Sequence, residues 1–134
     1  MTIRGDIALN ITKLSDDVSI SPQLQIEDLV RVKDLGFQTI IINRPDGEAP
    51  DQPGHDQVVD AAKALGLSAY YIPVSPGAED QSSVDAFASV LASNAGPTLA
   101  FCRSGMRSQQ LWKRASGQQS MAASVLGRLK GMLG

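Results

Sequence analysis

The segment CRSGMRS at residues 102–108 has the residue types and spacing that most clearly indicate a catalytic site. It begins with Cys102, the only cysteine of the 134 residues, and Arg107 follows after four intervening residues. A loop that leads into a helix directs backbone N–H groups and the positive end of the helix dipole at one point, which favours a thiolate and a bound anion. We therefore predict that Cys102 is a nucleophile, that Arg107 grips an anion, and that Ser108 donates a hydrogen bond to the sulfur.

The four intervening residues are predicted to form the anion-binding cradle with their backbone N–H groups. They are Arg103, Ser104, Gly105 and Met106. Gly105 permits the backbone conformation that such a cradle needs, and Arg103 is either a recruiter of anionic substrates or a solvated surface residue. A purely structural interpretation makes Cys102 a small buried residue at the end of an apolar run. That role does not require two arginines and a glycine to follow it.

The surrounding sequence predicts an α/β fold with a mostly parallel central sheet flanked by helices, because short apolar runs alternate with segments of helical period. Strands are expected at 36–43, 67–74 and 97–102, and helices at 26–35, 54–66 and 82–95. Ser82 and Asp85 suggest a capping box for the last of these helices. The first twenty residues resemble an irregular hairpin. A helix should follow Cys102 and place Trp112 in the core. A final helix is expected over about 118–133. Residues 1–134 are interpreted as one domain.

Two further segments should meet the cysteine loop, because ligands bind beyond the carboxyl ends of parallel strands. They are NRPDGE at 43–48 and PVSPGAED at 73–80. The first supplies Asn43, Arg44 and Asp46, and the second supplies Glu79 and Asp80. Arg44 either contacts the anion or pairs with Asp46 or Glu48. The sequence leaves open which carboxylate, if any, serves as an acid, and His55 is expected to be a solvent-exposed residue rather than a base.

Composition narrows the functional classes. Hydrophobic residues make up 43% of the chain, charged residues 19%, and the net charge is −2, so neither nucleic acid nor a membrane is an expected partner. No N-terminal hydrophobic leader is present, which predicts a cytoplasmic protein. One cysteine excludes an intramolecular disulfide, and with a single histidine it argues against an intrinsic zinc site. We predict no metal and no cofactor.

A family resemblance extends over most of the chain. The segments SPQL (21–24), GFQTIIINRPDGE (36–48), DQP (51–53), YYIPV (70–74) and FCRSGMRSQQLW (101–112) together resemble the phosphatase-like domain of beta-lactamase hydrolase-like proteins. The resemblance implies a dual-specificity-phosphatase-like fold, with Cys102 as the nucleophile and Arg107 as the anion-binding arginine. Some family members are fused to a metallo-hydrolase that resembles persulfide dioxygenases, which implies such a partner here. The cysteine loop is also similar to that of single-domain rhodaneses, so a rhodanese-like fold is the alternative.

The loop leaves two chemistries to compare. The cysteine-phosphatase signature C-x-x-G-x-x-R-[ST] has five residues between cysteine and arginine, and this chain has four. Phe101 replaces the histidine that usually precedes the cysteine, and no acid closely follows the IPV segment. These departures favour a rhodanese-type sulfurtransferase, in which Cys102 accepts sulfur from a small anionic donor as a persulfide and passes it to a thiol acceptor. The alternatives are a phosphatase with a phosphocysteine intermediate and a redox-sensing thiol protein.

Overall fold

The computed structural model describes residues 9–94 and 96–117. The described strands form one five-stranded sheet in the order β1-β2-β5-β3-β4. Their bounds are β1 Thr12–Lys13, β2 Val18–Ser21, β3 Thr39–Ile42, β4 Ser68–Tyr71 and β5 Thr98–Phe101. β1 is antiparallel to β2, and the other three pairings are parallel. The predicted α/β fold with a mostly parallel sheet is therefore confirmed.

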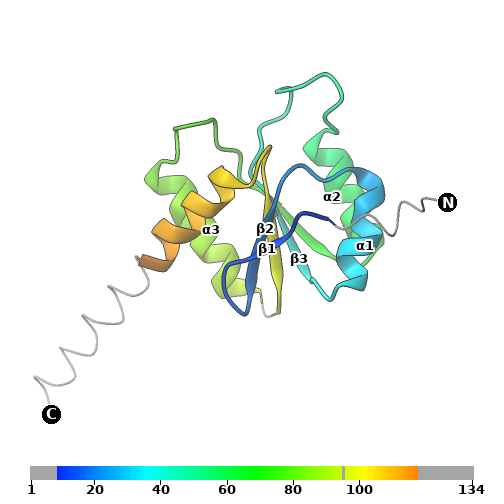
Figure 1. Cartoon of the computed structure of the whole chain (residues 1–134), viewed down its shortest axis with the longest axis horizontal. Helices are drawn as coiled ribbons and strands as arrows, with labels where there is room; N and C mark the ends of the chain where they lie inside the picture. Colours follow the sequence, from blue (N-terminus) through cyan, green and yellow to red (C-terminus); the bar gives the residue numbers. More distant parts are fainter. Residues whose placement is uncertain (1–8, 95, 118–134) are drawn as a thin grey trace, which may run out of the picture.

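Helices cover both faces of the sheet (Figure 1). The turn η2 Ile26–Asp28, α1 Leu29–Asp34 and α2 His55–Ala64 belong to one side, and α3 Gln81–Ser93 and the helix of residues 106–117 to the other. Alternate residues of the central strands enter two cores, as the two-residue period of a strand requires. Ile40 and Leu99 pack in the core of the first side, whereas Ile41 and Ala100 pack in that of the second.

The N-terminal hairpin is confirmed for the part of it that the structure describes. β1 pairs with β2 through Thr12 opposite Ile20, and β2 then pairs with β5. Leu9 and Ile11 pack against the core on the α1 side. The predicted final helix over 118–133 lies outside the described residues. Trp112 packs against the core on the α3 side, as expected.

Several element boundaries differ from the sequence prediction. The three observed strands are shorter than predicted, two of them by four residues and β5 by two, because the pairing ends where the chain leaves for a loop. The helix predicted at 26–35 begins with the separate turn η2. The capping box of Ser82 and Asp85 is wrong: Asp80 is the N-cap of α3, and its side chain accepts a hydrogen bond from the Ser83 N–H at 2.8 Å. Ser82 already lies in the first turn and donates its hydroxyl to Asp80.

Candidate active site

Cys102 directly follows β5, which lies between β2 and β3 in the sheet. The loop after β5 therefore starts at the middle of the carboxyl edge, where the chain turns into the helix of residues 106–117 (Figure 1). The Gly105 N–H donates to the Cys102 sulfur at 3.0 Å, and Cys102 is 0% exposed. Gly105 adopts a φ of 97°, a conformation that other residues rarely adopt. The loop thus folds its own amide onto the sulfur.

The other cradle residues face solvent. Arg103, Ser104 and Met106 are exposed, and Met106 keeps 65% of its surface accessible. The Arg103 carbonyl accepts a hydrogen bond from the Gln23 N–H at 3.3 Å, which fixes the loop to the segment after β2. Because Cys102 is fully buried, any reaction at its sulfur, with a substrate or with an oxidant, requires the surrounding loop to shift.

Arg107 is buried and held by Glu48, 59 residues away in the sequence. Its Nη1 and Nη2 donate to the two carboxylate oxygens of Glu48 at 2.8 and 2.9 Å, and Nη1 also donates to the Val74 carbonyl at 2.9 Å. The hydrogen bonds to Glu48 are the main reason why the pKa of Arg107 is raised, and the charge of Cys102 adds to the effect. The pKa of Glu48 is lowered, chiefly by Arg107 and also by Arg44.

Arg44 completes this charged cluster rather than reaching the loop. Its Nε donates to Glu48 Oε1 at 2.9 Å, and its Nη1 donates to Gln23 Oε1 at 3.1 Å. Of the two interpretations that the sequence left open, the structure favours ion pairing, with Glu48 and not with Asp46 as the partner.

Ser108 and Asn43 join the loop to the end of β3. The Ser108 hydroxyl donates to Asn43 Oδ1 at 2.8 Å, and Asn43 Nδ2 donates to the Ile72 carbonyl at 2.9 Å. Both side chains are fully buried. The expected donation from Ser108 to the Cys102 sulfur is therefore not observed, because the single hydroxyl hydrogen of Ser108 is directed at Asn43.

The carboxylate of Asp46 binds His55, the first residue of α2. The carboxylate accepts hydrogen bonds from the backbone N–H of His55 at 2.8 Å and pairs with His55 Nδ1 at 2.6 Å. The His55 ring stacks on Tyr71 with a centroid distance of 3.8 Å. The pKa of Asp46 is lowered, first by the side-chain hydrogen bond of His55. His55 is thus the first residue of α2, and its side chain is the partner of Asp46.

The two remaining acidic candidates have different surroundings. Asp80 caps α3, and its pKa is lowered by hydrogen bonds from Ser83 and Ser82. Glu79 instead lines a cavity of about 350 Å³ beside the cysteine loop. The cavity is bounded by Pro76, Gly77, Glu79, Arg103, Ser104, Met106, Arg107 and Gln110. Glu79, one of the carboxylates that the sequence proposed, lines this cavity together with Arg107.

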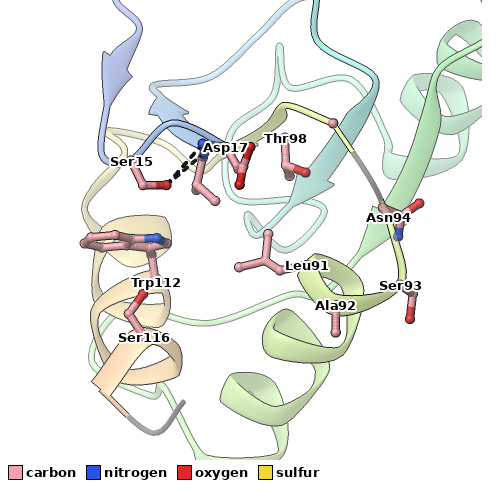
Figure 2. A pocket seen from close by; sticks show the side chains of 11 residues that line it. Ser15, Asp17, Leu91, Ala92, Ser93, Asn94, Thr98, Trp112 and Ser116 are labelled. Atoms are coloured by element: carbon pink, nitrogen blue, oxygen red, sulfur yellow. Dashed lines mark hydrogen bonds between the residues drawn. The ribbon is translucent and has the colours of Figure 1, made fainter. Parts of the chain in front are cut away.

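A larger cavity of about 590 Å³ lies elsewhere, between α3 and the helix of residues 106–117 (Figure 2). Trp112 and Leu91 line it, together with Val18 and Thr98, the first residues of β2 and β5. Those strand starts form the edge opposite to the cysteine loop, and no predicted catalytic residue lines this cavity.

Sequence reasoning brought the correct segments together but missed some of their contacts. Glu48 was considered only as a partner of Arg44. Gln23 and Val74 lie in segments that the sequence singled out, but neither was predicted to bind an arginine. The signal for Glu48 was present in the NRPDGE segment, which the sequence places at the carboxyl edge. No sequence signal indicates that the Val74 carbonyl binds Arg107.

A largely parallel sheet with a cysteine-arginine loop after its middle strand is the arrangement of a cysteine-phosphatase-like domain, and comparison with solved structures agrees. A candidate phosphatase from Neisseria meningitidis Z2491 is 35% identical, with a TM-score of 0.69 over 75% of this chain and 71% of that one. A candidate phosphatase from Shewanella putrefaciens CN-32 has a TM-score of 0.70 at 18% identity, over 83% and 72%. Kinase associated phosphatase has a TM-score of 0.59 at 18% identity, over 75% and 67%. The last two likenesses concern the fold alone.

The chain belongs to the family described as "Beta-lactamase hydrolase-like protein, phosphatase-like domain", which it matches over residues 10–120. Its curated relatives include beta-lactamase hydrolase-like proteins of Agrobacterium fabrum, 35% identical over 104 residues, and of Xylella fastidiosa, 32% identical over 104 residues. In both comparisons the match covers 78% of this chain and 24% of the relative. The family that the sequence resembled is confirmed. Among the described residues, no helix has the length and hydropathy needed to span a bilayer.

Proposed function

We propose that this domain hydrolyses a phosphate monoester through a phosphocysteine on Cys102. The observation that carries the proposal is that Glu79 and Arg107 line one cavity beside the cysteine loop, which supplies the acid that the sequence did not identify. The likeness to phosphatases supports the same chemistry and counts against our sequence-based preference for sulfur transfer.

In the proposed reaction, the Cys102 thiolate attacks phosphorus while the bond to the leaving oxygen breaks. Arg107 and the loop amides stabilise the phosphoryl oxygens, and Glu79 protonates the departing alkoxide. Water then attacks the phosphocysteine, the P–S bond breaks, and Glu79 takes up the proton of that water. Since Cys102 is fully buried in the described conformation, the loop residues 103–106, of which all but Gly105 are exposed, must shift to admit the substrate.

The proposal is tested with phenyl phosphate between mildly acidic and neutral pH. Turnover by the wild-type chain is expected, with no turnover by the Cys102→Ser variant. Rapid denaturation at alkaline pH, where the P–S bond is stable, should trap a phosphorylated chain in the wild type and none in the variant. Wild-type turnover no greater than that of Cys102→Ser would reject the phosphatase function.

Sulfur transfer remains the second candidate because of the four-residue spacing and the closed environment of the sulfur. In that reaction, the Cys102 thiolate attacks the outer sulfur of thiosulfate and releases sulfite. The resulting persulfide then passes its sulfur to a thiol acceptor, with a persulfide-dioxygenase-like partner as the proposed consumer of the product. Mass spectrometry after incubation with thiosulfate should then find about 32 Da added at Cys102, the mass of one persulfide sulfur. An unmodified chain would exclude this route.

A further inference from the structure

We propose that Glu48 is a positioning residue that orients Arg107 toward a bound oxyanion, and that Arg44 holds Glu48 in place for that task. This inference rests on the proposed function only in so far as Arg107 binds an anion. It assigns a role to the NRPDGE turn, which the sequence placed near the loop without explaining it.

The hydrogen bonds of Arg107 show which part of its guanidinium is already used. A guanidinium has five N–H groups in one plane. Nη1 donates one to Glu48 and one to the Val74 carbonyl, and Nη2 donates one to Glu48. No oxygen of Glu48 or Val74 accepts from the N–H of Nε or from the second N–H of Nη2, and these two lie along the same edge. The Cys102 sulfur is a further hydrogen-bond partner of the guanidinium and helps to raise the pKa of Arg107. Glu48 therefore takes the end of the guanidinium and leaves a complete two-pronged edge for an oxyanion.

In our proposal this edge of Arg107 is the part that binds the oxyanion. The Cys102 sulfur interacts with the Arg107 guanidinium closely enough to contribute to its raised pKa. Arg107 also lines the cavity beside the cysteine loop. A planar fork binds two oxygens well only when its orientation is correct, so fixing its far end before the substrate arrives reduces the cost of ordering the long side chain.

Arg44 fixes the carboxylate itself. Glu48 Oε1 accepts from both Arg44 Nε and Arg107 Nη2. Arg44 is only 5% exposed and is anchored at its other end to Gln23. Without Arg44, the 23% exposed carboxylate could follow Arg107 or turn toward solvent. Two arginines around one glutamate also leave the cluster with one net positive charge, which suits an anion site.

Four variants test these roles: Glu48→Gln, Glu48→Asp, Arg44→Gln and His55→Gln. The first two change the contact with Arg107, the third changes only the support of Glu48, and the fourth is a control that alters an ion pair of the same turn without reaching Arg107. The measurements are the dissociation constant of inorganic phosphate by calorimetry, kcat and KM for phenyl phosphate, and thermal unfolding, so that assays are run where each variant is folded.

Glu48→Gln and Glu48→Asp are expected to weaken phosphate binding and to lower kcat/KM by about tenfold to a hundredfold, since small misplacements of a positioning group have effects of that size. Arg44→Gln should produce a smaller loss, about threefold to tenfold, and His55→Gln should stay within about twofold of the wild type in phosphate affinity. A merely structural role for Glu48 would lower the unfolding temperature without changing phosphate affinity in the folded variant.

The outcomes separate this inference from the proposed function. If the wild type hydrolyses no ester but binds phosphate, and the Glu48 variants weaken that binding, the phosphatase proposal fails and the positioning role stands. If Glu48→Gln leaves both phosphate affinity and kcat/KM within about twofold, the positioning role is overturned. A wild-type chain that does not bind phosphate overturns it as well.

Discussion

The hydroxyl of Ser108 donates to Oδ1 of Asn43 across 2.8 Å, and this contact joins the helix after the cysteine loop to the chain leaving β3. Asn43 makes two further contacts: its Nδ2 donates to the Ile72 carbonyl and its backbone N–H donates to the Phe101 carbonyl. The Asn43 side chain thus connects Ile72, which directly follows β4, to Ser108, which follows the cysteine loop. It gives the segment after β3 a structural role that requires no contact with substrate.

Asn43→Leu is therefore expected to destabilise the fold, because it leaves the Ser108 hydroxyl and the Ile72 carbonyl buried without partners. The cost should be about 2–3 kcal/mol in the free energy of unfolding, measured by urea denaturation. Ser108→Ala removes only the donor and should cost about 1 kcal/mol. Equal stabilities of Asn43→Leu and the wild type would show that the bridge is energetically unimportant.

Glu79 and Asp80 are adjacent in the sequence but are expected to respond differently to loss of charge. Glu79→Gln should lower kcat for phenyl phosphate by about a hundredfold, a typical contribution of a general acid. The loss should be much smaller with p-nitrophenyl phosphate, because nitrophenolate leaves without protonation. Asp80→Asn should keep nearly wild-type kcat, since its side chain still caps α3. The same loss for both variants, or for both esters, would argue against Glu79 as the acid.

The Asp46–His55 pair predicts an acid-dependent part of the stability. The pKa of Asp46 is lower in the folded chain than its usual value of about 3.9, so the folded state binds this proton less readily than the unfolded state does. The Asp46–His55 pair thus makes its full contribution to stability above about pH 4, and this contribution is lost as the pH falls through the lowered pKa of Asp46 in the folded chain. Denaturation of the wild type and His55→Gln at several pH values should show a stability difference that is constant near pH 5 and shrinks below about pH 4. A difference that grows on acidification would contradict this assignment.

Gly105→Ala is expected to impair the site through the backbone rather than through lack of space. An added Cβ would lie 3.5 Å from the backbone of Ser21, an ordinary contact, but the φ of 97° costs another residue about 1 kcal/mol or more. Gly36→Ala is the matched control, with the same φ of 97° and no atom within 4 Å of its added Cβ. Both variants should lose similar thermal stability, and only Gly105→Ala should lose about tenfold or more in kcat/KM. Equal activity of the two would show that the Gly105 amide does not need its present position.

Much of the fold was accessible from local patterns. Ile40, Ile41 and Ile42 form an apolar run because both faces of β3 are covered, and the alternation of such runs with amphipathic segments predicts the parallel sheet. The helix after Cys102 also followed from local signals, whereas α3 ends at Ser93, two residues before its predicted end at residue 95. The cap at Asp80 was missed because Ser82 is an equally good capping residue by type, and only the backbone conformation distinguishes them.

The candidate site was predictable as a set of segments but not as a set of contacts. The Arg107–Glu48 ion pair depends on β5 lying beside β3, an order that the strand patterns alone do not determine. The Ser108 hydroxyl was assigned to the sulfur because the two are near in sequence, whereas its actual partner is 65 residues away. The distinction between Glu79 and Asp80 required the start of α3 to be located to within one residue.

The six residues from Asn43 to Glu48 have one further consequence, which concerns chain length. Within this turn, Asn43 binds Ser108, Asp46 binds the first residue of α2, and Glu48 binds Arg107. Inserting or deleting a single residue would shift at least two of these partners at once, so the turn should tolerate substitution far better than a change in length. A designer who transplants the cysteine loop into another scaffold would need to carry this turn with it as a unit.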